Sequence, residues 1–248
     1  MRPQKRLKMY EALKAKNATR FANVKLTRSF TSTVKKMLAN KARYQAVETK
    51  TGVPWPVIAA IHVREADMSF NTQLAQGDPL SRVSTHVPRG QGPYFGADAW
   101  ERAAMQALSD TGGKTWGDWS PGGWTTFLEK YNGLGYANKG RPSPYVWAGT
   151  NQYTSGKYIA DGQYSSSTVD PQPGGANLIV ALAALDPTIN PHDLTPGKTM
   201  GPKATVGTVV ATGGVVAAAA QPHLWPWILG GVAAIILVLI IVHFLEKK

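Results

Sequence analysis

The chain has 248 residues, enough for one domain of moderate size with additional segments. It contains no cysteine, which excludes disulfide bonds, a thiolate nucleophile and a cysteine-based metal site. The formal net charge is +12, and residues 1–50 account for it, because they carry 14 Lys and Arg against two Glu. This basic arm predicts contact with anionic lipid or an acidic envelope polymer, although a solubilising charged face explains the same composition.

The first fifty residues predict two helices. A short basic helix is expected over residues 5–16, and a longer helix from a cap at Thr31 or Ser32 to Gly52. We assign residues 1–49 to a basic helical N-terminal region. The first twenty residues are charged and lack the continuous apolar stretch of a cleavable signal peptide.

A third predicted helix carries the residue on which the functional hypothesis depends. Val57, Ile58 and Ile61 form an apolar face, and Glu65 follows where the helix meets a polar, turn-rich stretch. A carboxyl group at such a place can be half buried, and burial raises its pKa toward the range of a general acid. The alternative is a solvated surface charge that pairs with a neighbour such as Arg64. His62 is expected to be a hydrogen-bonded structural residue.

The middle of the chain predicts a mainly α fold. A loop-rich stretch over residues 67–97 is followed by amphipathic helices over residues 99–108 and 124–131, a short helix over residues 144–148 and an apolar helix over residues 177–185. Alternating Val-rich segments that would build a sheet are scarce between residues 1 and 190.

The C-terminal part predicts a membrane anchor. Residues 186–223 are rich in Pro, Gly, Ala and Val and are expected to form a linker. Residues 224–245 are apolar apart from His243 and long enough to span a bilayer as a helix, and a charged tail follows at residues 246–248. We therefore expect a single-pass membrane protein. Its orientation stays open, because Lys247 and Lys248 favour a cytoplasmic C-terminus and the basic arm favours the opposite.

Several short blocks resemble one protein family. In order they are IHVRE at 61–65, FNT at 70–72, QGDPL at 76–80, THVP at 85–88, WE at 100–101, FLEKYNGLGY at 127–136, SPYVW at 143–147 and GKYIADG at 156–162. Together they resemble phage and prophage peptidoglycan-degrading proteins of the lysozyme-like superfamily, related to lytic transglycosylases and goose-type lysozymes. The match covers about residues 50–185.

The resemblance implies a helical lysozyme-like catalytic domain over residues 50–185, with a glycan groove between its lobes. It implies cleavage of the β-1,4 bond between N-acetylmuramic acid and N-acetylglucosamine, with Glu65 as the general acid. Tyr131 and Asn132 resemble the Tyr-Asn motif that holds the sugar beside the scissile bond. Tyr145, Tyr153 and Tyr158 are candidates for stacking on sugar rings, with a place in the core as the alternative.

A second carboxylate is needed if the enzyme hydrolyses with inversion, because it must activate water. Asp78 and Asp161 are the candidates, and either is equally suited to forming a turn before Pro or Gly. If neither serves, the muramyl 6-hydroxyl replaces water and Glu65 acts alone, as in lytic transglycosylases.

The resulting hypothesis is an endolysin-type glycosidase that serves bacterial lysis from the host inner membrane or a virion membrane. Its expected partners are peptidoglycan glycan strands, the lipid bilayer through residues 224–245, and anionic lipid or envelope polymer through residues 1–50. No metal, other cofactor or nucleic acid is expected. The alternative is a non-catalytic peptidoglycan-binding or structural component of a phage lysis or virion complex.

Overall fold

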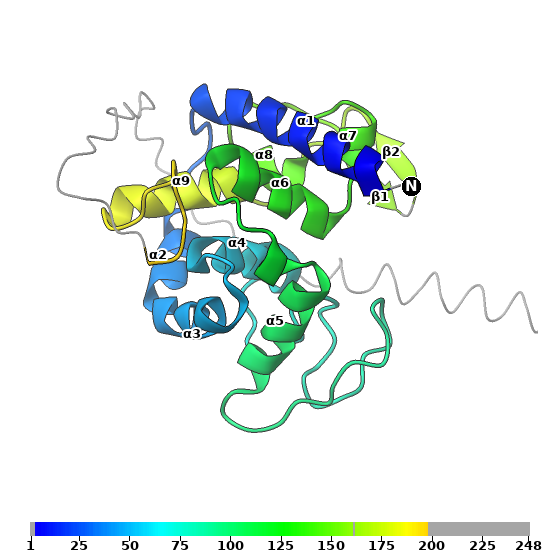
Figure 1. Cartoon of the computed structure of the whole chain (residues 1–248), viewed down its shortest axis with the longest axis vertical. Coiled ribbons are helices and arrows are strands. Elements are labelled where there is room, and N and C mark those ends of the chain that lie inside the picture. The colour runs from blue at the N-terminus through cyan, green and yellow to red at the C-terminus, as the bar shows by residue number, and fades with distance from the viewer. Residues whose placement is uncertain (1–2, 161, 198–248) are drawn as a thin grey trace, which may run out of the picture. The chain divides into compact units, whose positions relative to one another are not determined.

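The structure is a computed structural model that describes residues 3–160 and 162–197 (Figure 1). Within these residues the chain is mainly helical, as predicted, with one two-stranded antiparallel sheet. The elements are α1 (Pro3–Ala22), α2 (Thr31–Ala39), α3 (Lys41–Thr51), α4 (Trp55–Ala66), α5 (Ala99–Asp110), the 3-10 helix η1 (Gly113–Thr115), α6 (Pro121–Asn132), α7 (Gly135–Asn138), α8 (Pro144–Trp147), β1 (Lys157–Ala160), β2 (Gln163–Ser165) and α9 (Gly175–Leu185).

Helix α4 is the centre of the core. It packs against α2, α3, α6 and α9, and every residue from Trp55 to Val63 is buried (Figure 1). A helix that is apolar on all sides, as this one is, is stable only when it is covered all round. Each of its large side chains, such as Ile58 and Ile61, contributes about 1.5–3 kcal/mol by leaving water.

The single helix predicted from residue 31 to Gly52 is two helices. The break lies at Asn40, whose backbone leaves helical geometry at φ −102° and ψ 12°. Its side-chain amide donates to the carbonyl of Lys36 at 2.9 Å, which is how Asn competes with helical backbone bonding. The predicted cap is also wrong, because α2 begins at Thr31 without any side-chain cap bond. The predicted end at Gly52 is confirmed by its left-handed conformation.

The predicted basic helix is longer than residues 5–16 and lies against the domain. Helix α1 packs along α6, where the buried amide of Asn17 donates to Thr126 Oγ1 at 3.1 Å and to Glu129 Oε1 at 3.2 Å (Figure 1). The helices approach so closely that a Cβ atom on Gly122 would lie 2.5 Å from the carbonyl oxygen of Lys14. Helix α1 is therefore part of the packed domain, and besides α6 it contacts Trp116 through Tyr10 and Gly140 through Lys16.

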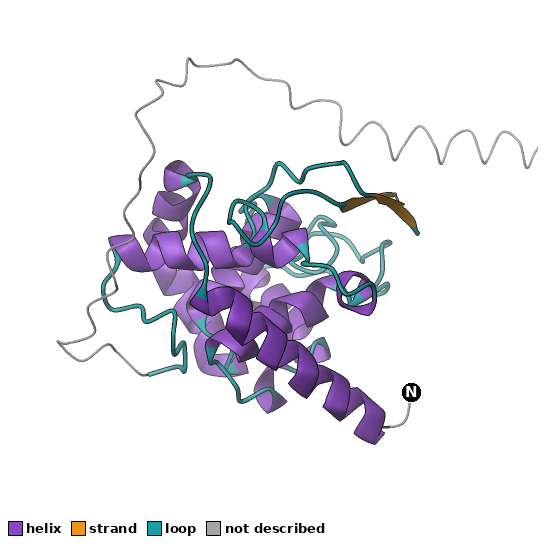
Figure 2. Ribbon diagram, turned by 90° about the horizontal axis from the view of Figure 1, so that it is seen from above, coloured by secondary structure: helices purple, strands orange, loops and turns teal. Residues whose placement is uncertain are grey.

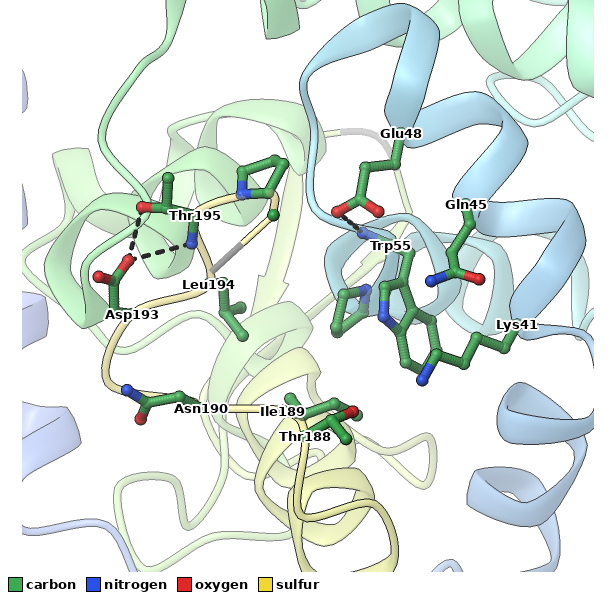
Figure 3. A pocket seen from close by; sticks show the side chains of 13 residues that line it. Lys41, Gln45, Glu48, Trp55, Thr188, Ile189, Asn190, Asp193, Leu194 and Thr195 are labelled. Carbon is green, nitrogen blue, oxygen red and sulfur yellow. Dashed lines mark hydrogen bonds between the residues drawn. The ribbon is translucent and has the colours of Figure 1, made fainter. Parts of the chain in front are cut away.

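The first residues of the predicted linker also pack on the domain. Ile189 and Leu194 are buried, and Lys41 pairs with Asp186 at 2.7 Å. Figure 3 shows this segment opposite α3 and Trp55, with a cavity of about 340 Å³ between them. Residues 186–197 thus complete the core beside α4 rather than beginning a linker.

No helix among residues 3–160 and 162–197 is long and apolar enough to cross a membrane. The predicted transmembrane helix at residues 224–245, the tail at residues 246–248 and most of the predicted linker, residues 198–223, lie outside the described residues.

The contact between α1 and α6 predicts a pH dependence of stability. Burial raises the pKa of Glu129 from 4.5 to about 7. Between pH 4.5 and 7 the folded chain keeps this proton while the unfolded chain loses it, so stability falls as the pH rises. We expect the Glu129→Gln variant to gain about 3 kcal/mol relative to the parent across that range.

Urea unfolding in a non-ionic detergent, followed by tryptophan fluorescence at pH 4.5 and 7.5, measures this difference. His62 and Glu65 titrate in both proteins, so their effects cancel in the comparison. An equal difference between the two proteins at both pH values would contradict the prediction.

Candidate active site

Glu65 lies in the last turn of α4, and the helix ends immediately after it. Asp67 and Met68 have backbone φ angles of +46° and +64°, which residues other than glycine rarely adopt. Their backbone N–H groups donate to the carbonyls of Val63 and His62, both at 3.2 Å. This paired closure of the last turn fixes the direction in which the chain leaves the helix.

His62 stabilises the corner at the end of α4, where the chain leaves the helix, from inside the core. It is fully buried, and burial lowers its pKa to about 4, so the ring is neutral. Nε2 donates to the carbonyl of Ser69 at 3.0 Å, which leaves Nδ1 to accept from the Tyr44 hydroxyl at 3.1 Å. The ring is therefore the hydrogen-bonded structural residue that the sequence predicts.

The Glu65 carboxyl group is half-buried and bound by a tyrosine. Tyr145, in α8, donates its hydroxyl to Glu65 Oε1 at 2.8 Å. Burial raises the pKa of Glu65, although this hydrogen bond and the charge of Arg64 oppose the rise. Burial and the nearby Glu65 charge also raise the pKa of Tyr131 and Tyr145, so both phenols stay protonated. The corner thus holds a carboxyl group whose neutral form is favoured.

A groove of about 460 Å³ lies beside this corner, between the ends of α4 and α6 and the β1–β2 hairpin. Figure 2 shows the hairpin at the edge of the helical domain. Glu65 does not line the groove, but Tyr145, its hydrogen-bond donor, does. The other lining residues include Arg64, Asn132, Tyr136, Lys157, Tyr158 and Asp170.

Charged side chains hold the hairpin side of the groove to α4. Arg64 pairs with Asp170 at 2.8 Å, with both side chains buried, and Lys157 pairs with the other carboxylate oxygen at 3.1 Å. Burial alone would raise the pKa of Asp170, but the charge and hydrogen bond of Arg64 hold it below its usual value. Two cations against one anion leave this wall of the groove positive. Arg64 therefore pairs with Asp170 and not with Glu65.

Asp78 is engaged in building the loop that follows. Its carboxylate accepts from the backbone N–H groups of Thr85 and His86, each at 3.0 Å, and from His86 Nδ1 at 2.8 Å. Burial alone would raise its pKa, but the bonds from His86 and Thr85 bring it below the usual value. A carboxylate saturated in this way is poorly suited to activate water, so its turn-forming role is the better supported one.

The predicted sugar-binding residues fall into two groups. Asn132 and Tyr158 line the groove, as Tyr145 does, and Tyr131 lies close enough to sense the Glu65 charge. Tyr153 is buried instead, and its hydroxyl accepts from the backbone N–H of Asp170 at 3.0 Å, so it supports the chain behind the hairpin. Asp161 lies outside the described residues.

Sequence reasoning missed Asp170, Lys157 and Tyr136. Asp170 is 106 positions from Arg64, and neither residue belongs to a periodic pattern, so no local signal links them. Within the described ranges, no group of three or more His, Asp or Glu side chains could hold a metal ion.

Comparisons with protein-family models, with curated proteins and with solved structures found no match for this chain.

The hydrogen bond from Tyr145 predicts a measurable effect on Glu65. The Tyr145→Phe variant loses a donor that stabilises the carboxylate, so the Glu65 midpoint should move to higher pH. Carbon-13 NMR of glutamate side-chain carboxyl groups, assigned with the Glu65→Gln variant, measures the midpoint. Tyr153→Phe removes a hydroxyl that bonds elsewhere and should leave it unchanged. An unmoved midpoint in Tyr145→Phe would show that the bond does not tune this carboxyl group.

The loop-building role of Asp78 predicts a local loss of protection. In Asp78→Asn the charge-assisted bonds weaken, which should cost about 1–2 kcal/mol. Amide hydrogen exchange should speed up over residues 84–91. Asp98→Asn, which weakens an exposed pair with Arg102, is the matched control and should leave that loop protected. Unchanged exchange in Asp78→Asn would argue that the carboxylate is free for another role.

Proposed function

We propose that this chain is a peptidoglycan-degrading glycosidase that cleaves the β-1,4 bond between N-acetylmuramic acid and N-acetylglucosamine. The observation that carries the proposal is the half-buried Glu65 carboxyl group, held by Tyr145 beside a groove of about 460 Å³. The ordered blocks that resemble lysozyme-like enzymes supply the substrate class, and Glu65 falls in the first of them.

Glu65 acts as the general acid. The glycosidic oxygen is a poor leaving group and must receive a proton as its bond to the anomeric carbon breaks. Burial keeps Glu65 protonated to higher pH than a solvated carboxyl group, and the Tyr145 hydroxyl fixes its orientation. Asn132 and Tyr158 line the groove, and we expect them to contact the sugar rings.

The reaction is completed by one of two routes. In transglycosylation the Glu65 carboxylate takes the proton of the muramyl 6-hydroxyl, whose oxygen then bonds to the anomeric carbon. In inverting hydrolysis there is no separate second step: another carboxylate takes a proton from water while the water oxygen bonds to the anomeric carbon and the protonated leaving group departs. The bonds to Thr85 and His86 that saturate Asp78 favour the first route, and Asp161 is the remaining candidate for the second.

The predicted membrane helix at residues 224–245 would localise the enzyme to a membrane. Anchored to a host inner membrane or a virion membrane, the domain would be held near the wall and serve bacterial lysis. Tethering raises the local concentration of groove and glycan without any further contact.

Digestion of purified peptidoglycan by the full chain in a non-ionic detergent, with mass analysis of the products, tests the proposal. We expect muropeptides from the parent and at least a hundredfold less from Glu65→Gln, since general acid catalysis contributes about 10²–10⁴-fold. Tyr10→Phe, at a ring that packs on Trp116 and does not line the groove, is the matched control and should retain activity.

Each product identifies a route. Anhydro-muropeptides indicate transglycosylation by Glu65 alone, and reducing-end muropeptides indicate hydrolysis and direct attention to Asp161. Full activity in Glu65→Gln would overturn the mechanism. A folded parent that binds peptidoglycan without releasing product would support the non-catalytic binding or structural role instead.

A further inference from the structure

A third cavity, of about 220 Å³, lies between α1, α6 and α7. It takes no part in the proposed glycosidase site, and none of its lining residues lines the groove beside Glu65. Its walls divide by chemistry. Met9, Ala12 and Leu13 of α1 and Ala137 of α7 give an apolar surface, and the polar lining includes three cationic side chains: Lys16, Arg20 and Arg141.

The cations of this pocket are poorly compensated. In the described part of the chain, no carboxylate lies within 4.0 Å of the charged groups of Arg20 or Arg141. Lys16 donates to the carbonyl of Gly140 at 3.1 Å, which is a neutral acceptor. A cluster of cations with this little compensation attracts an anion.

Glu129 is the acidic residue of the pocket, and it offsets little of this charge. It is buried, and Asn17 donates to its carboxyl group at 3.2 Å. Burial raises the pKa of Glu129 to about 7, and even when it is ionised this single carboxylate offsets one of the three positive charges. The pocket therefore keeps a net positive charge of about two.

The apolar wall of the pocket favours an anion that also carries an apolar part. Leu13 is 9% exposed, and Ala12 and Ala137 are small enough to leave the space open. A free inorganic anion would satisfy the cations and leave this wall in water, whereas an uncharged apolar ligand would leave the cations unpaired. The volume of about 220 Å³ leaves room for a small charged group and the atoms attached to it, but not for whole acyl chains.

We propose that the α1–α6–α7 pocket binds the headgroup of an anionic phospholipid, with the phosphate on Arg20, Arg141 and Lys16 and the start of the acyl chains on the apolar wall. The site would hold α1 at the surface of an anionic membrane. The proposal does not depend on the glycosidase activity, since it uses different side chains.

Native mass spectrometry of the full chain in a non-ionic detergent measures the binding. The probes are dihexanoyl-phosphatidylglycerol, dihexanoyl-phosphatidylcholine and inorganic phosphate. We expect phosphatidylglycerol to bind about tenfold more tightly than phosphatidylcholine. The Arg20→Gln/Arg141→Gln variant should lose that preference. Lys35→Gln/Lys36→Gln, which removes two exposed charges from α2 outside the pocket, is the matched control and should keep it.

Two single variants separate binding from folding. Arg141 is exposed, so Arg141→Gln should fold normally and lose several-fold in affinity for phosphatidylglycerol. Ala12→Leu fills the pocket with a good helix former and should weaken lipid binding without changing any charge. Equal loss in the α2 control, equal affinity for the two lipids, or phosphate binding as tight as phosphatidylglycerol would each overturn the proposal.

Discussion

The geometry of the candidate site depends on one buried, neutral imidazole. His62 is enclosed by Phe70 and Trp100, whose ring centroids lie 4.6 and 4.5 Å away, and both ring nitrogens are hydrogen-bonded. A charged ring would be costly there, so the pKa near 4 and the fixed tautomer follow from the enclosure. Because the ring ties α3 to the chain beyond α4, it sets where the helix stops and hence where Glu65 stands.

The wall of the groove that the β1–β2 hairpin forms is held to α4 by ion pairs rather than by apolar packing. The hairpin carries few buried apolar side chains, and Ile159 on β1 is 59% exposed. Its position relative to α4 depends on Asp170, whose carboxylate joins Arg64 and Lys157 and whose backbone N–H donates to the Tyr153 hydroxyl. Removing one partner of such a buried pair is strongly destabilising, since an uncompensated charge remains. Arg64, which holds this wall through Asp170, and Glu65 are consecutive residues of α4. The last turn of α4 therefore positions both the groove wall and the carboxyl group.

Local sequence patterns predicted the helices around the candidate site, whereas contacts between distant segments were not predicted. The apolar face of Val57, Ile58 and Ile61 predicted α4, and the polar stretch after it correctly placed Glu65 at a helix end. The break at Asn40 was missed although an Asn inside a helix is a local signal. The docking of α1 on α6 could not be predicted, since it depends on a close approach at Gly122 that no periodicity reveals.

Part of the excess positive charge of residues 1–50 is used in ion pairs within the folded domain. The N-terminal cations meet carboxylates of the later, electrically neutral part: Lys14 with Asp118, Lys41 with Asp186, and Arg43 with Glu101. Arg43 also covers the ring of Phe70, with its guanidinium carbon 3.9 Å from the ring centroid. Three of the 14 cations in residues 1–50 are therefore the positive half of ion pairs within the domain. The cations that these three pairs leave uncompensated include Lys16 and Arg20 beside Glu129, which the proposed lipid site uses.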